Sequence, residues 1–159
     1  MKKIIKNIIE DQDDNNIALT SESSPPLLYK DLKSLVNKIA SQLAGNGILN
    51  KDRAVIVLPN GPFMASSFLA LSSYMSAAPL NPSYKTDEYE FYLKDLNPKI
   101  VIVEPNSSNK VVGVAKNLNI PVCEMKIKKD DPSGLFNLFN IESKYQLPEE
   151  NDEGLVLHT

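Results

Sequence analysis

The stretch KDRAVIVLPNGPF, residues 51–63, decides the fold. Its centre, from Ala54 to Pro59, is apolar at every position rather than at alternate positions. A strand has this composition when helices cover both faces of a parallel sheet. A polar turn, Asn60–Gly61, follows at once, and then Pro62, which suits the first position of a helix because its missing N–H would have no partner there. The stretch therefore predicts a buried strand that leads through a tight turn into a helix.

Helical periodicity flanks this strand on both sides. The helix before it begins near Lys30, and its apolar residues share the spacing of one helical face: Leu32, Leu35, Val36, Ile39 and Leu43. Gly45 and Gly47 supply a stop for that helix. The helix after it has an apolar face made of Met64, Phe68, Leu71 and Met75. Most of its other positions are Ala or Ser, small residues that allow a close approach to a sheet or to another helix.

The same alternation continues along the rest of the chain. Extended segments are predicted over residues 77–84, 99–105, 120–125 and 154–159. A helix is predicted over 86–98, with Thr86 as its cap and Pro98 as its stop, and another after a cap at Ser107 or Ser108. Strands that alternate with helices predict an α/β fold, a doubly wound and mainly parallel sheet flanked by helices. The order of the strands does not follow from the sequence.

One α/β domain accounts for residues 1–159. Within it, residues 1–28 form an N-terminal extension with two short strands joined by a Ser/Pro turn, and residues 126–150 are rich in loops. No run of apolar residues is long enough for a transmembrane span, and the first residues lack the cleavage site of a signal peptide. We therefore expect a soluble intracellular protein, located in the cytoplasm or in the peroxisome.

Composition excludes several kinds of site. The net charge is −3, and the basic residues are scattered Lys residues with Arg53 as the one Arg, so a nucleic-acid partner is not expected. Cys123 and His158 are the one Cys and the one His, so neither a disulfide within the chain nor a Cys- or His-rich metal site can form. Cys123 lies in an apolar stretch and is interpreted as a small buried residue. No metal ligands are assigned.

Complete catalytic motifs are absent from the sequence. Neither phosphate-binding loop, G-x-G-x-x-G or G-x-x-x-x-G-K-[ST], occurs, and G-x-S-x-G and H-E-x-x-H are missing as well. Two turns remain candidates for lining a ligand site. Asn60–Gly61 is either a helix cap or a turn that faces a ligand, and the turn at 81–84 either shapes a pocket or only joins a strand to a helix.

The succession of these stretches resembles the start of the adenylate-forming, or AMP-binding, enzymes. These are the acyl- and aryl-CoA synthetases, the luciferases and the adenylation domains of peptide synthetases. The resemblance covers about 130 residues, and its main elements are LLYKDL at 27–32, LPN at 58–60, PLNPSY at 79–84 and LVLHT at 155–159. Within the family the chain looks most similar to the peroxisomal-type CoA synthetases and oxalate–CoA ligase.

The resemblance implies what the last residues do. In the family, the final strand leads into the loop T-S-G-T-T-G-x-P-K, which wraps the phosphates of ATP. Thr159 matches the first position of that loop and His158 precedes it, so both are candidate nucleotide-binding residues. No catalytic residue can be assigned. The resemblance implies ATP, Mg²⁺ and CoA as cofactors of the parent enzyme and a small carboxylic acid as its substrate, none of them bound tightly by these 159 residues.

The chain is therefore expected to be an incomplete N-terminal part of an AMP-binding large domain, inactive by itself. It is also expected to form homo-oligomers through apolar surfaces and sheet edges that the rest of the enzyme would cover. Two alternatives stay open. One is a stand-alone α/β module with a binding or regulatory role and no catalysis, and the other is an unrelated small flavodoxin-like domain.

Overall fold

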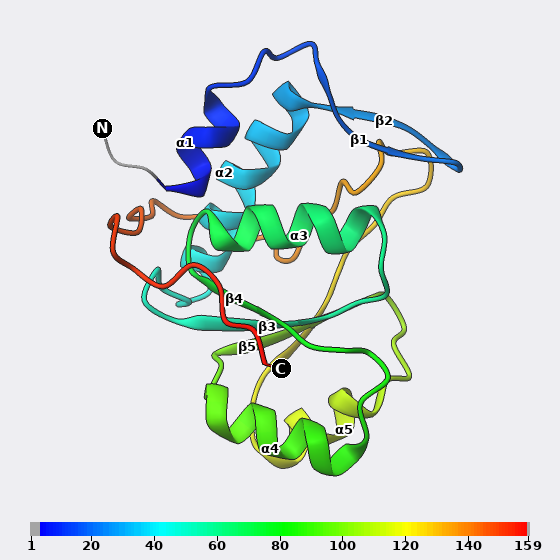
Figure 1. Ribbon diagram of the computed structural model, residues 1–159, viewed down its shortest axis with the longest axis vertical. Coiled ribbons are helices and arrows are strands. Elements are labelled where there is room, and N and C mark those ends of the chain that lie inside the picture. The colour runs from blue at the N-terminus through cyan, green and yellow to red at the C-terminus, as the bar shows by residue number, and fades with distance from the viewer. Residues whose placement is uncertain (1–3, 159) are drawn as a thin grey trace.

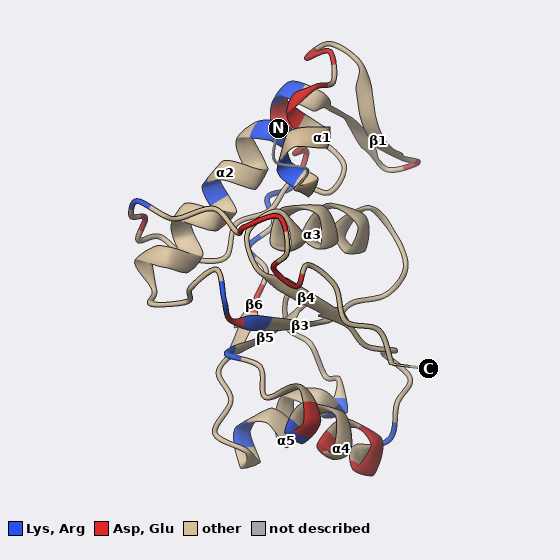
Figure 2. Ribbon diagram, turned by 60° about the vertical axis from the view of Figure 1, so that its left-hand side comes forward, with Lys and Arg blue, Asp and Glu red and all other residues tan. Residues whose placement is uncertain are grey.

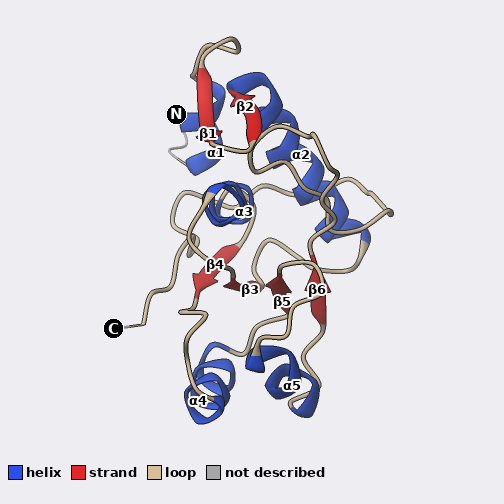
Figure 3. Cartoon of the chain, turned by 90° about the vertical axis from the view of Figure 1, so that its right-hand side faces the viewer, coloured by secondary structure: helices blue, strands red, loops and turns tan. Residues whose placement is uncertain are grey.

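The computed structural model describes residues 4–158 and has three layers. A four-stranded parallel sheet lies in the middle, in the order β4-β3-β5-β6, with bounds Ser76–Pro79, Arg53–Val57, Ile100–Val103 and Val122–Glu124. Helices α1, Ile5–Glu10, α2, Tyr29–Gly45, and α3, Pro62–Ser72, lie on one side of it, and helices α4, Thr86–Leu96, and α5, Lys110–Asn117, lie on the other (Figures 1 and 3). The doubly wound α/β fold predicted from the sequence is confirmed.

The strand β3 explains why its sequence is apolar at every position. Ala54 and Ile56 pack into a cluster with α2 and α3, whereas Val55 and Val57 pack into a second cluster with α4 and α5. Each of the four is at most 3% exposed. Since successive side chains of a strand point to opposite faces, a strand between two helical layers needs an apolar residue at every position.

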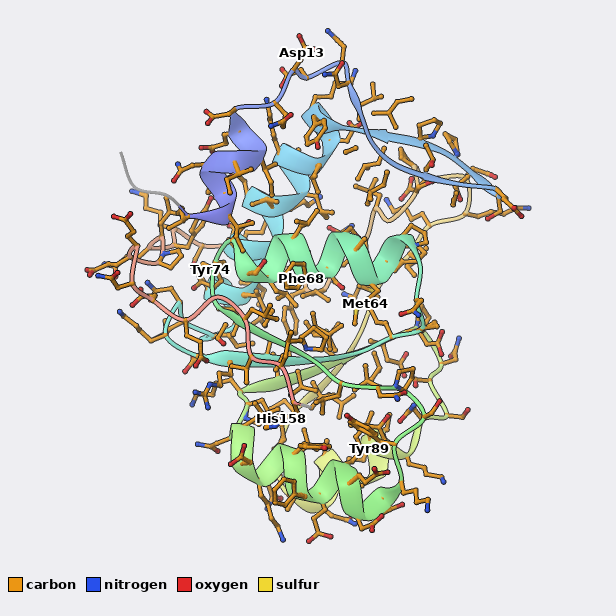
Figure 4. All side chains as sticks on the ribbon, in the orientation of Figure 1. Asp13, Met64, Phe68, Tyr74, Tyr89 and His158 are labelled. Atoms are coloured by element: carbon orange, nitrogen blue, oxygen red, sulfur yellow. The ribbon has the colours of Figure 1, made fainter. Side chains whose placement is uncertain are left out.

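The helix α3 brings small residues against its neighbours. Ser66, Ser67 and Ala70 are completely buried in its middle. The hydroxyl of Ser66 donates to the Gly134 carbonyl at 2.7 Å and that of Ser67 donates to the Met64 carbonyl at 3.1 Å, so their burial leaves neither donor unpaired. Figure 4 shows α3 lying directly over the sheet, with Met64 and Phe68 on it.

The N-terminal residues form a hairpin and a helix beside α2. Strand β1, Ile17–Ser21, pairs antiparallel with β2, Ser24–Leu28, in a separate two-stranded sheet. The short helix α1 that precedes it was not predicted from the sequence. Ile9 of α1 is buried in the cluster with α2 and α3, so packing against these helices stabilises the short helix.

Two predicted helix caps were wrong by a few residues. Helix α4 begins at Thr86, but the residue before it, Lys85, occupies the cap position, and its backbone N–H donates to the Glu88 carboxylate at 2.8 Å. Helix α5 is capped by Asn109 rather than by Ser107 or Ser108, because the Asn109 side chain accepts from the backbone N–H of Val111 at 2.9 Å. In both cases the chain enters the helix within three residues of the predicted cap.

The loop-rich residues 126–150 pass from the end of β6 to the opposite edge of the sheet, along α2. Gln42 of α2, 2% exposed, holds this passage: its side-chain N–H donates to the Asn137 side chain at 2.9 Å, and its side-chain oxygen accepts from the backbone N–H groups of Leu138 and Phe139. Farther along, the Ser41 hydroxyl donates to the carbonyl of Ser143. Ordinary side-chain hydrogen bonds therefore replace the helix that usually connects parallel strands.

The last predicted strand, residues 154–159, does not form as a strand. Residues 154–156 instead make a single parallel bridge to β4, in which Ala77 donates to the Gly154 carbonyl at 3.0 Å and Val156 donates to the Ala77 carbonyl at 2.9 Å. Thr159 lies outside the described residues. Among residues 4–158, no helix has the length and apolar composition needed to cross a bilayer.

Candidate functional site

The strand order creates a crevice at one edge of the sheet. β3 lies between β4 and β5. The connection after β3 leads to β4 on one side, and the connection after β5 leads to β6 on the other side. Beyond the carboxyl ends of two such strands their connections diverge, and ligands of doubly wound sheets bind at this point. The carboxyl edge of β3 and β5 is therefore the candidate site.

A small hollow of about 200 Å³ occupies this crevice. It is lined by the turn from β3 into α3 and by the residues that follow β5 and β6: Leu58 to Phe63, Glu104, Pro105, Met125 and Ile127. Gly61 has φ +152° and caps α3, and Pro62 is the first residue of that helix. The Asn60–Gly61 turn thus serves as a helix cap and also lines the hollow.

A second, wider hollow of about 530 Å³ lies on the β4 side of the same turn. The segment after β4 forms its outer wall and is held by three hydrogen bonds. The Asn81 side chain accepts from the backbone N–H of Ser83, the Asn81 carbonyl accepts from the Tyr89 hydroxyl, and the Pro82 carbonyl accepts from the Asn109 side chain, at 2.8 to 2.9 Å. The turn at 81–84, a candidate from the sequence, is therefore a fixed wall of a hollow at the carboxyl edge.

The segment 154–158 runs toward this edge. Because it lies parallel to β4, its end points in the same direction as the carboxyl ends of the sheet strands. Figure 3 shows the segment that leads toward the C-terminus beside β4, outside the sheet. A loop that continued from residue 158 would start next to the wall formed by the segment after β4.

His158, a candidate from the sequence, packs against α4 (Figure 4). Its ring lies 4.6 Å from the Tyr92 ring, tilted by 37°, and its Nε2 is 3.5 Å from a carboxylate oxygen of Asp95. Nε2 is buried and has no hydrogen-bond partner among the described residues. Tyr92 in turn contacts the ring of Tyr84, at 5.0 Å. The structure thus places His158 at one end of an aromatic group on α4, and the spacing of residues in the sequence gave no signal for this contact.

The start of the same segment is held by charge. Glu153 accepts two hydrogen bonds from the Arg53 guanidinium, at 2.7 and 3.0 Å, and one from the Ser76 hydroxyl at 2.6 Å. The bonds from Arg53 lower the pKa of the Glu153 carboxyl; partial burial opposes them, and the bond from Ser76 adds to them. Figure 2 shows acidic residues on the late stretch of chain that passes beside β4, near basic residues at the start of β3. Sequence reasoning did not find this cluster, because its members are 23 to 100 residues apart.

No group of three or more His, Cys, Asp or Glu side chains able to hold a metal ion occurs within residues 4–158. Cys123 is 8% exposed and its Sγ lies 3.6 Å from the Leu138 carbonyl. Burial raises the pKa of its thiol to about 11. At neutral pH the thiol is therefore protonated and a poor nucleophile.

Comparison with known proteins places this fold among one group of enzymes. Residues 10–154 match the AMP-binding enzyme family. The chain is 34% identical over 95 residues to a probable CoA ligase, CCL9, of Humulus lupulus, and 30% identical over 105 residues to the oxalate–CoA ligase of Saccharomyces cerevisiae. These alignments cover 59% and 62% of this chain but only 18% and 19% of the relatives, so the chain spans about a fifth of their length.

Solved structures share the fold at low sequence identity. Apo MatB from Rhodopseudomonas palustris superposes with a TM-score of 0.78 at 19% identity, over 100% of this chain and 32% of that one. The o-succinylbenzoate CoA synthetase MenE from Bacillus subtilis, in complex with the acyl-adenylate intermediate OSB-AMP, gives a TM-score of 0.67 at 18% identity, over 91% of this chain and 35% of that one.

Proposed function

Since this chain belongs to the AMP-binding enzyme family, we propose that it is the N-terminal part of an ATP-dependent acyl-CoA synthetase. The family match over residues 10–154 is the observation that carries the proposal. The names of the relatives support it, because a CoA ligase and an oxalate–CoA ligase are among them. So does the fold, which is similar to that of MatB with ATP bound and of MenE with ATP and a magnesium ion.

The reaction proposed for the parent enzyme has two steps. In the first, a carboxylate oxygen of a small acid attacks the α-phosphorus of ATP, an acyl–phosphate bond forms, and the bond to pyrophosphate breaks. In the second, the thiol of CoA loses its proton and attacks the acyl carbon, so that a thioester forms and AMP leaves. Charge develops on phosphoryl oxygens in the first step, which donors fixed in advance stabilise.

The described residues supply the scaffold of such a site rather than its chemistry. Segment 154–158 ends at the carboxyl edge of the sheet, where a phosphate-binding loop that begins at Thr159 would start. His158, at the end of this segment, is proposed to support that loop through its contacts with α4. The carboxylates of residues 4–158 do not gather into a magnesium site, so we derive no step that involves the ion from them.

We further propose that the 159 residues are inactive alone and bind neither ATP nor CoA tightly. ATP–pyrophosphate exchange, measured with the purified chain and a panel of small carboxylic acids that includes oxalate, is expected to stay at background. Sustained exchange that requires one of these acids would refute the inactivity. The gene after the Thr159 codon tests the assignment to a synthetase: a frame that encodes S-G-T-T supports it, and a stop codon favours a stand-alone binding or regulatory module.

Self-association is the last part of the proposal. Leu155 and Leu157, on segment 154–158 beside β4, are 41% and 65% exposed. An uncovered edge with apolar side chains favours pairing with another chain, so we expect dimers or larger species. Light scattering at increasing concentration measures this, and a monomer throughout would contradict it. For the parent enzyme we propose an intracellular location, in the cytoplasm or in the peroxisome.

A further inference from the structure

Segment 153–158 is attached to the sheet at three points. Glu153 binds Arg53 and Ser76 at the amino edge, Gly154 and Val156 bond to Ala77 in the middle, and His158 packs on α4 at the carboxyl edge. We propose that the cluster of Arg53, Ser76 and Glu153 is a positioning device: it sets the register of this segment against β4 and so fixes where residue 158 reaches the carboxyl edge. The importance of that position rests on the function proposed above, in which the nucleotide loop begins at the next residue.

The geometry of the cluster is specific rather than a loose charge contact. The Arg53 Nε donates to one Glu153 oxygen at 2.7 Å, and its Nη2 donates to the other at 3.0 Å. The third nitrogen, Nη1, donates to the Leu96 carbonyl at 3.2 Å, which holds the guanidinium in place from the side of α4. The Ser76 hydroxyl donates to Glu153 as well, at 2.6 Å. Paired parallel bonds between a guanidinium and a carboxylate define one orientation.

The cluster is placed where it can define register. Arg53 and Ser76 are the first residues of β3 and β4, and they are paired neighbours in the sheet. Glu153 directly precedes Gly154, whose carbonyl accepts from Ala77. A slip by one residue would move Glu153 by about 3.3 Å and turn each side chain of the segment to the opposite face. The slip would therefore break all three bonds to Glu153.

Backbone pairing alone defines the register of this segment weakly. The segment makes a single bridge to β4, with one hydrogen bond on each side of Ala77. Leu155 and Leu157 are 41% and 65% exposed, so the side-chain contacts that a slip would lose are those of Val156 and His158 on the other face. The ion pair and hydrogen bond at Glu153 therefore add a constraint on the register that the two backbone hydrogen bonds do not provide.

The effect should be local, and this makes the inference testable. Arg53 and Glu153 have side chains that are 38% and 42% exposed. Ion pairs with this exposure contribute little to global stability. Loss of the pair is therefore expected to loosen segment 153–158 and to leave the core of the sheet intact.

Amide hydrogen exchange of the 159-residue chain, followed by NMR, tests this. In Glu153→Gln and in Arg53→Met, exchange at Val156 and Ala77 is expected to accelerate by about two- to fivefold, the size of one lost exposed ion pair. The double variant is expected to match Glu153→Gln, because the two residues act as one unit. Val101, whose amide bonds to the Pro121 carbonyl in the sheet centre, is expected to keep its rate. The matched control is Lys94→Met, which removes an exposed ion pair with Glu90 on α4 and is expected to change neither rate.

Three results would overturn the inference. They are unchanged exchange at Val156 in Glu153→Gln, acceleration at Val101 as large as at Val156, and single-variant effects that add in the double variant. The second would mean that the pair stabilises the whole fold, and the third that Arg53 and Glu153 act separately. None of these measurements involves ATP, so they fail or succeed independently of the ATP–pyrophosphate exchange and gene tests of the proposed function.

Discussion

Gly134, in the loop-rich segment 126–150, lies directly against the start of α3, and it tests how this segment is held. Its φ is +78°, in the left-handed region that side chains disfavour. A Cβ at this position would lie 2.8 Å from the Pro62 carbonyl oxygen and 3.0 Å from the Ser66 hydroxyl. That hydroxyl also donates to the Gly134 carbonyl at 2.7 Å in a buried bond. Substitution by Ala therefore has two effects: it strains the backbone, and it forces the segment away from α3.

The two effects can be estimated separately. The left-handed conformation costs an Ala about 1–2 kcal/mol. Forcing a methyl group into a contact below 3.0 Å costs about 1–3 kcal/mol by the usual range for overpacking. We expect Gly134→Ala to lower the free energy of unfolding by about 3 kcal/mol. For a domain of this size, that corresponds to a fall in Tm of roughly 6–12 °C.

Gly113 supplies the matched control. It lies in α5, and a Cβ there would meet nothing within 4 Å. Replacement of a Gly inside a helix by Ala stabilises it by about 0.5–1 kcal/mol, so Gly113→Ala is expected to raise the Tm slightly. Circular dichroism melts of both variants and the wild type measure the three values. A Tm of Gly134→Ala at or above that of the wild type would refute the close approach, as would shifts of equal sign in both variants.

Of three further predictions, two concern the pH dependence of titrating side chains and one concerns a buried hydrogen bond. Because Arg53 holds the folded-state pKa of Glu153 below its ordinary value of 4.5, the protection of the Val156 amide should be complete above pH 4.5 and fall as the pH drops through the lower folded value, as measured by hydrogen exchange. Because the pKa of Cys123 is raised from 9.0 to about 11, its contribution to stability is complete below pH 9 and lost between about pH 9 and 11; urea unfolding should show the wild type losing about 3 kcal/mol more than Cys123→Ala over this interval. Tyr74→Phe removes the hydroxyl that donates to the Ile48 carbonyl at 2.9 Å, and thermal unfolding should show a loss of about 1 kcal/mol.

The central strands could be predicted because their signal is local. The run from Ala54 to Val57 is apolar at each position, and the structure divides it evenly between the two clusters. The same holds for residues 100–103 of β5, which are all at most 1% exposed. Where a strand is covered on both faces, composition alone identifies it, whichever strands lie next to it. The order β4-β3-β5-β6 depends on distant partners and could not be predicted.

The last segment was mispredicted as a strand because its sequence is apolar but its environment is one-sided. Val156 packs in the cluster with α4 and α5, whereas Leu155 and Leu157 on either side of it are exposed. The segment finds only β4 to pair with, and that pairing is limited to one bridge. Whether the segment pairs with β4 over more than one bridge depends on its neighbours in the folded protein, and sequence periodicity carries no information about them.

Only part of the candidate site could be predicted from the sequence, for a related reason. The turns at Asn60–Gly61 and 81–84 follow closely after strands, and strand ends can be located from composition. No local pattern marks Arg53 or Glu153 as part of a cluster. Each is a charged residue at the border of an apolar run, and such residues are usually interpreted as solvated surface charges. Their pairing follows only from the path of residues 126–150, which the buried side chain of Gln42 holds against α2.

That path has a consequence for the site itself. β6 ends at the carboxyl edge, on the side of the sheet away from β4. To add a parallel segment beside β4, the chain must return to the amino edge and cross the width of the sheet, and residues 126–150 do both along α2. An antiparallel return beside β6 would need a much shorter loop, but it would deliver its end to the amino edge. The long irregular connection is therefore the feature that brings His158 to the same edge as the turns after β3 and β4, and the Arg53–Glu153 pair marks the point at which the chain starts back along the sheet.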